Sequence, residues 1–175
     1  MVARLAASAD TIGRRLNWFV ERLCAVLVAV MVAIVWFGVV SRYLVDLGAT
    51  WTEELARYVM IWAALLAVSC GAYRREHIGL DFFSHRLAPR ARLVLTVSLD
   101  LLGIGFFLFL FVYGLGMATA GAGQYATIFG MTMFFPFASV PVAAALTVFQ
   151  ITVTMLRNIG GMEKPPDHYE PSVVQ

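Results

Sequence analysis

The residues best suited to chemistry in this sequence lie between Trp51 and Tyr58, in the stretch WTEELARY. Glu53 and Glu54 stand four and three residues before Arg57, so on a helix either carboxylate can pair with the arginine. The apolar run that follows, 58–72, gives only about 15 residues, and a bilayer core of about 30 Å needs about 20. A spanning helix must therefore include Arg57 and place the glutamates at its edge. A charge at that depth is costly and needs a partner.

Two interpretations of this acidic and basic group stay open. Thr50 stands three residues before Glu53, as in a capping box, and early acids complement the helix dipole. Capping does not explain Arg57, because a cation near a helix N-terminus opposes the dipole. The alternative is a polar clamp beneath Trp51, made within the helix or between subunits.

Composition assigns the chain to the membrane. Of its 175 residues, 61% are hydrophobic and 14% are charged, whereas soluble domains carry roughly 25% charge. The arginines flank apolar runs and form no continuous basic face, which argues against nucleic-acid binding.

The apolar runs predict an all-α integral membrane protein with four transmembrane helices. Residues 1–160 form one membrane domain, and residues 161–175, which are rich in proline, form a disordered cytoplasmic tail. Residues 1–19 mix arginines with large apolar side chains, which favours a short amphipathic helix on the membrane surface. The spanning helices are expected at about 18–44, 51–73, 92–118 and 131–156.

The distribution of positive charge sets the orientation. Eleven of the 13 Lys and Arg residues lie in the N-terminal segment and the entry of the first span, between the second span and the start of the third, or after the fourth. The positive-inside rule then places both termini in the cytoplasm and Glu53 and Glu54 at the outer face. Cys24 and Cys70 lie near the cytoplasmic ends of their helices, where disulfides rarely persist.

No pattern of an enzyme or a cofactor protein is present. The three histidines, His77, His85 and His168, fall in the second connection and the tail, so they cannot face one another across a bundle as haem ligands. The serines are isolated, and the sequence lacks a glycine-rich phosphate loop. We expect no catalytic residue, no cofactor and no metal site.

Asp100 lies about eight residues into the third span, roughly 12 Å deep. It is either a proton or sodium ligand or a structural carboxyl that faces the bundle. Small residues at spacings of four, 63–67–71 and 114–118–122, permit close approach of helices, either within the chain or to another subunit.

The second span resembles a known family. The stretch WTEELARY at 51–58, then Trp62, then RREHIGLD at 74–81, is similar to the signature of the small, DctQ-like membrane subunit of TRAP (tripartite ATP-independent periplasmic) transporters. The family pattern is an acidic pair and an arginine opening the helix, a tryptophan one turn on, and a His-Ile-x-x-Asp element at the cytoplasmic exit. The chain departs from it at Gly79 and Leu80, where the family often has a basic residue.

The resemblance implies a subunit of the bacterial inner membrane that pairs with a large membrane subunit and a soluble periplasmic binding protein. The large subunit holds the sodium and substrate sites, and the substrate is an organic acid. The small subunit is an auxiliary scaffold without a substrate site of its own.

On this interpretation each end of the second span has a role. We expect Glu53, Glu54 and Arg57 to fix its outer end beneath Trp51, and Arg74, Arg75, His77 and Asp81 to anchor its cytoplasmic exit to lipid or to the large subunit. The alternative is a small homodimeric transporter that couples to an ion through Asp100 or Glu53.

Overall fold

Four long helices make up the chain. The computed structural model describes residues 2–44, 49–74, 89–128 and 130–159. The helices are α1 (Val2–Tyr43), α2 (Trp51–Arg74), α4 (Pro89–Gly121) and α5 (Phe134–Ile159). Each contains a segment long and apolar enough to cross a membrane, of 35, 24, 29 and 24 residues in chain order. The predicted all-α membrane fold with four spans is confirmed.

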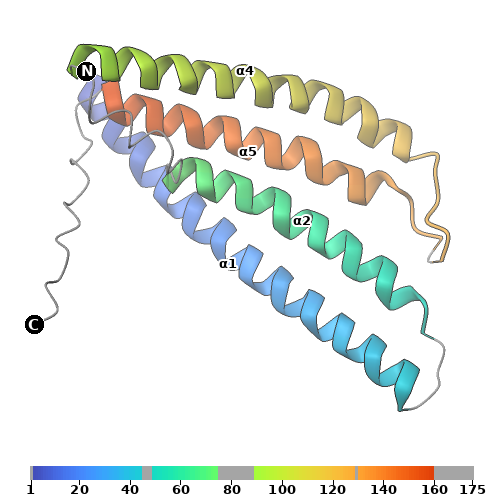
Figure 1. Ribbon diagram of the computed structural model, residues 1–175. Coiled ribbons are helices and arrows are strands. Elements are labelled where there is room, and N and C mark those ends of the chain that lie inside the picture. The colour runs from blue at the N-terminus through green and yellow to red at the C-terminus, as the bar shows by residue number, and fades with distance from the viewer. Residues whose placement is uncertain (1, 45–48, 75–88, 129, 160–175) are drawn as a thin grey trace, which may run out of the picture.

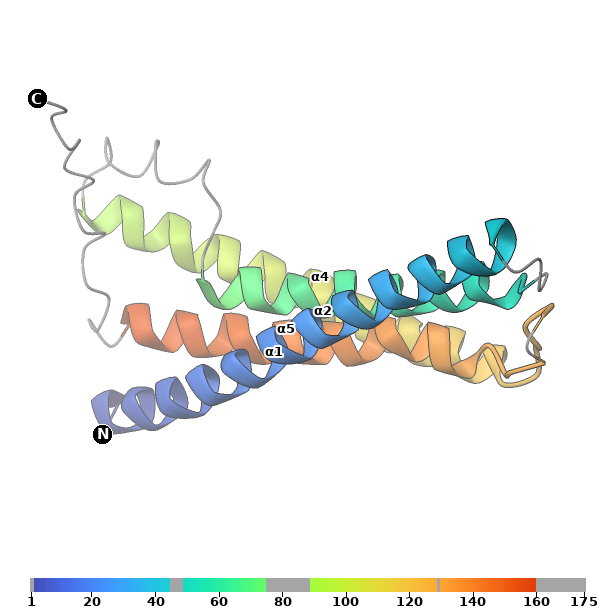
Figure 2. The ribbon, with the colours of Figure 1, turned by 90° about the horizontal axis from the view of Figure 1, so that it is seen from below.

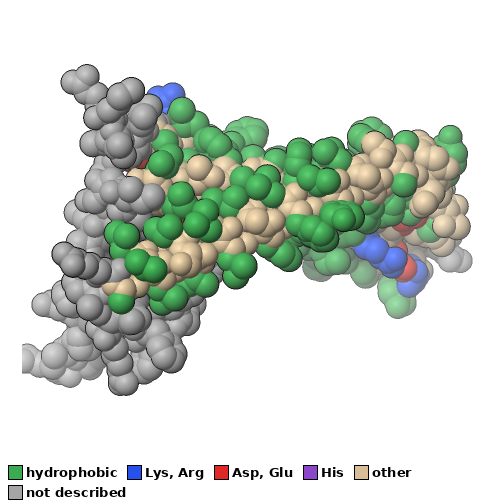
Figure 3. All heavy atoms as spheres, turned by 90° about the horizontal axis from the view of Figure 1, so that it is seen from above, with side chains coloured by type: hydrophobic (Ala, Val, Ile, Leu, Met, Phe, Trp, Pro, Cys, Tyr) green, Lys and Arg blue, Asp and Glu red, His purple; other side chains and the backbone are tan. Residues whose placement is uncertain are grey.

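The helices lie side by side in the order α1, α2, α5, α4 (Figure 1). α2 and α5 occupy the middle, α4 packs on α5, and α1 runs obliquely across α2 and the far end of α5 (Figure 2). Hydrophobic side chains cover most of one face, and charged side chains gather towards its ends (Figure 3). The two ends of the described chain lie at the same end of the layer, as an even number of spans requires. Which side of the membrane they face stays a prediction.

α1 differs from its predicted form. The expected amphipathic helix is not a separate element, because α1 continues without a break from Val2 to Tyr43. Gly13 lies where α1 crosses the other helices. A Cβ there would come within 2.8 Å of a Val153 methyl and 3.2 Å of the Tyr73 ring. The absence of a side chain lets the continuous α1 touch both α2 and α5.

α4 and α5 approach each other closely at two glycines of α4. A Cβ on Gly114 would lie 3.0 Å from Cδ of Pro141, and one on Gly121 would lie 2.6 Å from the Phe137 ring. Pro141 removes one backbone donor from the interior of α5. Because the ring of Pro141 faces a glycine, α5 stays in contact with α4 where a proline would otherwise crowd its neighbour.

Small hydroxyl side chains fill much of the interior. Ser69, Ser139, Thr147 and Thr154 are at most 3% exposed. Each hydroxyl donates to a backbone carbonyl three or four residues earlier, over 2.6–3.1 Å. A hydroxyl satisfied within its own helix can be buried without a partner across the interface.

The glycine contacts give a testable prediction. Gly114→Leu should destabilise the chain by about 1–3 kcal/mol, because the new side chain must displace Pro141 and Val140. Gly116→Leu is the matched control, since a Cβ at Gly116 meets nothing within 4 Å. Unfolding by denaturing detergent, followed by circular dichroism, measures both. Equal stability of the two variants would contradict the close approach of α4 and α5.

Candidate functional site

The two glutamates at the N-terminal end of α2 point to different neighbours. Glu53 Oε1 lies 2.7 Å from Nη2 of Arg42, at the end of α1. Both side chains of this pair are more than half exposed, so it contributes at most about 1 kcal/mol. Thr50 stands just before the helix, where a capping box would begin, but the Glu53 carboxylate binds Arg42 of α1. Its role is therefore to join α1 to α2.

Glu54 joins α2 to the segment before α5. Its Oε1 accepts a hydrogen bond from the Tyr58 hydroxyl at 2.7 Å, and its Oε2 accepts one from the backbone N–H of Ile128 at 3.2 Å. Two turns further along the same side of α2, Nε1 of Trp62 donates to the Phe135 carbonyl at 3.1 Å. Residues 54, 58 and 62 thus form one line of polar contacts between α2 and the start of α5.

The segment that Glu54 holds is an ordered turn between α4 and α5. Ala126 N–H donates to the Met131 carbonyl and Met133 N–H to the Gln124 carbonyl, each at 2.8 Å. Gly130 adopts a φ of +61°, in the left-handed region that glycine tolerates. The sequence analysis assigned no role to this connection and did not predict its turn or its acidic partner.

Arg57 has a different environment from the one expected. It is exposed, and the described residues offer it no ion pair. The expectation that it pairs with Glu53 or Glu54 is wrong. Arg42 takes the first acid, and Tyr58 and Ile128 take the second. Trp51 packs against Phe37 of α1, with the ring centroids 5.7 Å apart.

At the other end of α2, Arg74 forms an ion pair with Glu21 of α1. Arg75, His77 and Asp81 lie outside the described residues. The anchoring role expected for this end of α2 therefore stays a prediction. Cys24 and Cys70 are both free thiols, in agreement with the absence of a disulfide expected from the sequence.

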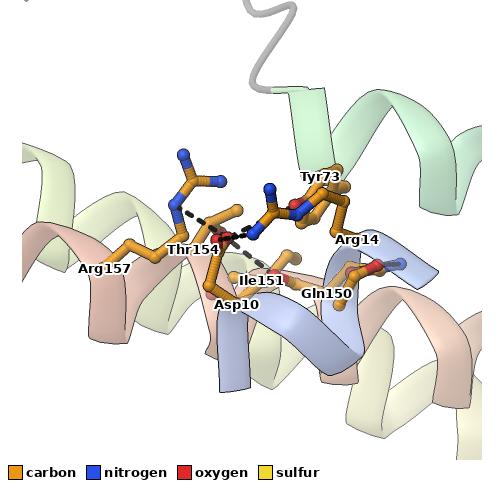
Figure 4. A network of polar contacts seen from close by, with 8 residues as sticks. Asp10, Arg14, Tyr73, Gln150, Ile151, Thr154 and Arg157 are labelled. Atoms are coloured by element: carbon orange, nitrogen blue, oxygen red, sulfur yellow. Dashed lines mark hydrogen bonds and ion pairs between the residues drawn. The ribbon is translucent and has the colours of Figure 1, made fainter. Parts of the chain in front are cut away.

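A second polar cluster, which the sequence interpretation did not include, joins three helices around Asp10 (Figure 4). Asp10 accepts hydrogen bonds from Arg14 at 3.0 Å and from the Tyr73 hydroxyl at 3.3 Å, and it forms an ion pair with Nε of Arg157 at 3.3 Å. The Arg157 guanidinium also lies 5.7 Å from the centroid of the Tyr73 ring. α1, α2 and α5 thus share one carboxylate. The four-residue spacing of Asp10 and Arg14 is the feature of the sequence that could have indicated an ion pair here.

Asp100 lies on the side of α4 that meets α5. It is half-buried, and three residues later a Cβ on Gly103 would lie 3.3 Å from Ile151. Among the described residues no three His, Cys, Asp or Glu side chains gather into a group that could hold a metal ion. The polar groups of α2 bind other parts of the chain. Glu54 does so at the N-terminal end of the helix and Tyr73 at its C-terminal end.

Comparison with known proteins identifies the class. Residues 31–161 match the family described as "Tripartite ATP-independent periplasmic transporters, DctQ component". The chain belongs to the DctQ family. The resemblance inferred from helix α2 is confirmed, and the family is one of transporter subunits and not of enzymes.

Curated relatives agree with this assignment. The chain is 30% identical over 86 residues to the sialic acid TRAP transporter small permease protein SiaQ of Vibrio cholerae, a match that covers 49% of this chain and 50% of that protein. It is 30% identical over 87 residues to a putative TRAP transporter small permease protein of Haemophilus influenzae, covering 50% of this chain and 54% of that one. The chain therefore matches about half the length of these relatives.

A third relative is the isethionate TRAP transporter permease protein DctMQ of Oleidesulfovibrio alaskensis. It is 35% identical over 54 residues, covering 31% of this chain and 8% of that protein. With its four apolar helices, the DctQ-family chain is a multi-pass protein of the bacterial inner membrane.

In this DctQ-family chain, the line of polar contacts made by residues 54, 58 and 62 can be tested through Glu54. Glu54→Ala should speed hydrogen exchange of the Ile128 amide by about tenfold or more, because a bond to a charged acceptor contributes roughly 1.5–3 kcal/mol. Exchange measured by NMR in detergent micelles reports this amide. Glu53→Ala, which removes only the exposed pair with Arg42, serves as the control and should leave the rate unchanged. Unchanged exchange in Glu54→Ala would refute this anchoring role.

The Asp10 cluster gives a parallel test. Asp10→Asn should lower the free energy of unfolding by about 1–3 kcal/mol, since Arg14, Tyr73 and Arg157 all lose a charged acceptor. Glu21→Gln breaks the exposed pair with Arg74 and should cost less than about 1 kcal/mol. Detergent-induced unfolding compares the two variants. If Asp10→Asn costs no more than Glu21→Gln, the cluster does not hold the three helices together.

Proposed function

We propose that this chain is the auxiliary small subunit of a sodium-coupled TRAP uptake system for an organic acid. It pairs with a large membrane subunit, which carries the sodium and substrate sites, and with a soluble periplasmic binding protein. In this proposal the chain forms part of the static scaffold.

The observation that carries this proposal is the arrangement of the helices in a layer. α1 and α4 lie at its two edges (Figure 1). In the most apolar stretch of each of these two helices, no residue is buried. Most of the buried serine and threonine hydroxyls of the layer bond to its own backbone, as those of Ser69 and Thr147 do. A layer built in this way suits a scaffold whose faces are covered by lipid and by another membrane protein.

Relatives of the chain support the partner and the substrate class. The relative named DctMQ matches this chain over only 8% of its own length, so most of that permease consists of other sequence. This favours a large membrane component that works with a chain like this one. Two relatives are named for sialic acid and isethionate, which are both organic acids.

Reconstitution tests the proposal. Proteoliposomes that contain this chain, its large subunit and the loaded binding protein should take up the organic acid when sodium is supplied outside. Omission of any component, or replacement of sodium by potassium, should abolish uptake. Sodium-dependent uptake by the purified chain alone would overturn the proposal. It would favour the autonomous transporter, for which Asp100→Asn should then remove the coupling.

A further inference from the structure

One side of α2 is left uncovered by the rest of the described chain. The residues on it are Glu53, Arg57, Met60, Ala64, Ala67, Gly71 and Arg74, which we call the α2 seam. All are exposed except Gly71, which is half-exposed and has open space where a Cβ would stand. The spacing alternates between four and three residues. A 3.5-residue period of this kind is the pattern of a helix that packs along a second helix at a small crossing angle.

The opposite side of α2 is already occupied. Thr52 and Ala63 face α1, where a Cβ on Gly38 would lie 2.6 Å from the Thr52 hydroxyl and Cys24 contacts the Ala63 carbonyl. Tyr58 and Trp62 face the start of α5. Between its two ends, where Glu53 and Arg74 pair with Arg42 and Glu21 of α1, the α2 seam is a distinct third side that points away from both neighbours.

Arg57 makes this side unsuitable for lipid alone. α2 has 24 residues, about 36 Å of helix, so a centred hydrocarbon core of about 30 Å would begin near Glu53. Arg57 then lies about 6 Å inside that boundary, exposed and without an ion pair to any described residue. Glu53 cannot fully neutralise it, because Arg42 already binds that carboxylate. An arginine at this depth is costly without a partner, and the described residues supply no acid for it.

The middle of the seam differs from the other exposed surfaces. Below Arg57 the seam carries Met60 and then Ala64, Ala67 and Gly71, and the exposed Val68 lies beside them. Exposed positions of α4 carry large side chains that suit lipid: Leu101, Leu102, Phe106, Phe109, Val112 and Tyr113, each more than half exposed. Small side chains gain little from lipid but allow two helix backbones to approach closely. The charge at one end and the small residues in the middle thus suit the same occupant, a second helix.

We propose that the α2 seam is the docking surface for a transmembrane helix of the large permease subunit, and that this helix places a carboxylate opposite Arg57. The inference rests on the proposed function and specifies which surface of the chain makes the complex. The partner helix crosses α2 at a small angle, with its backbone close to Ala64, Ala67 and Gly71. Arg57 sets the register, because its carboxylate partner must lie at the same depth.

Matched glycine substitutions test the surface. The chain is co-expressed with a tagged large subunit, and the amount of chain retained on the tag is measured. Gly71→Leu should reduce retention at least about tenfold, equivalent to about 1.4 kcal/mol of binding free energy, because the new side chain holds the helices apart. Gly105→Leu on α4 is the control, since a Cβ at Gly105 also meets nothing within 4 Å. It should leave retention unchanged. Circular dichroism of each purified variant should show unchanged helix content.

Arg57 is tested in the same assay. Arg57→Gln should lower retention at least about tenfold, because the partner carboxylate is left unpaired in the membrane. Arg57→Lys keeps the charge and should retain most of the complex. Full retention of Arg57→Gln would overturn the proposal and leave Arg57 as an anchor for lipid headgroups.

The remaining outcomes separate this inference from the proposed function. If the wild-type chain is retained but Gly105→Leu and not Gly71→Leu disrupts the complex, only the docking surface is wrong. If the wild-type chain is not retained by the large subunit at all, the proposed function itself fails. If the purified chain alone is a dimer that Gly71→Leu converts to a monomer, the seam binds a second copy and the proposal is overturned.

Discussion

Helices in a bilayer gain little by exchanging lipid for one another, so close contact and polar bonds must hold them together. This constraint explains where the described chain has glycines and hydroxyls. Gly13, Gly114 and Gly121 lie where a Cβ would collide with a neighbouring helix. Ser69 and Thr147 lie buried between helices with their hydroxyls bound to their own backbone. Most buried serine and threonine hydroxyls are satisfied in this way, whereas Asn17 Oδ1, Ser41 Oγ and Gln150 Oε1 are buried without a hydrogen bond to any described residue.

The same constraint explains why charge is used at the ends of the helices. Glu54 at one end and Asp10 at the other each bind groups from separate parts of the chain. At the membrane boundary such bonds are stronger than in open water, and their loss is more costly. α2 takes part in both clusters, through Tyr58 and Tyr73, and so fixes α1 and α5 at opposite ends. It is the helix on which the rest of the layer is positioned.

Most of the fold could be predicted from the sequence, because a span in lipid is a local property. Its length and apolar character are set by consecutive residues, and the four helices were found within a few residues at most ends. The exception was the start of α1, where arginines among apolar side chains suggested a separate surface helix, although Gly13 packs that segment against Val153 and Tyr73. The family could be recognised because much of its signature lies in consecutive residues at the start of α2, from Trp51 to Trp62.

The partners of the charged residues could not be predicted in the same way. Helical spacing made Arg57 the nearest cation to Glu53 and Glu54, but Arg42 and Tyr58 are closer in the folded chain. The position of Arg42 depends on how α1 crosses α2, and that of Ile128 on the turn before α5. Neither can be obtained from spacing along α2. Because spacing assigned Arg57 to these two acids, the sequence analysis did not identify Arg57 as a cation without an acidic partner in the described chain. Once both acids are bound elsewhere, Arg57 remains exposed and without an ion pair to any described residue.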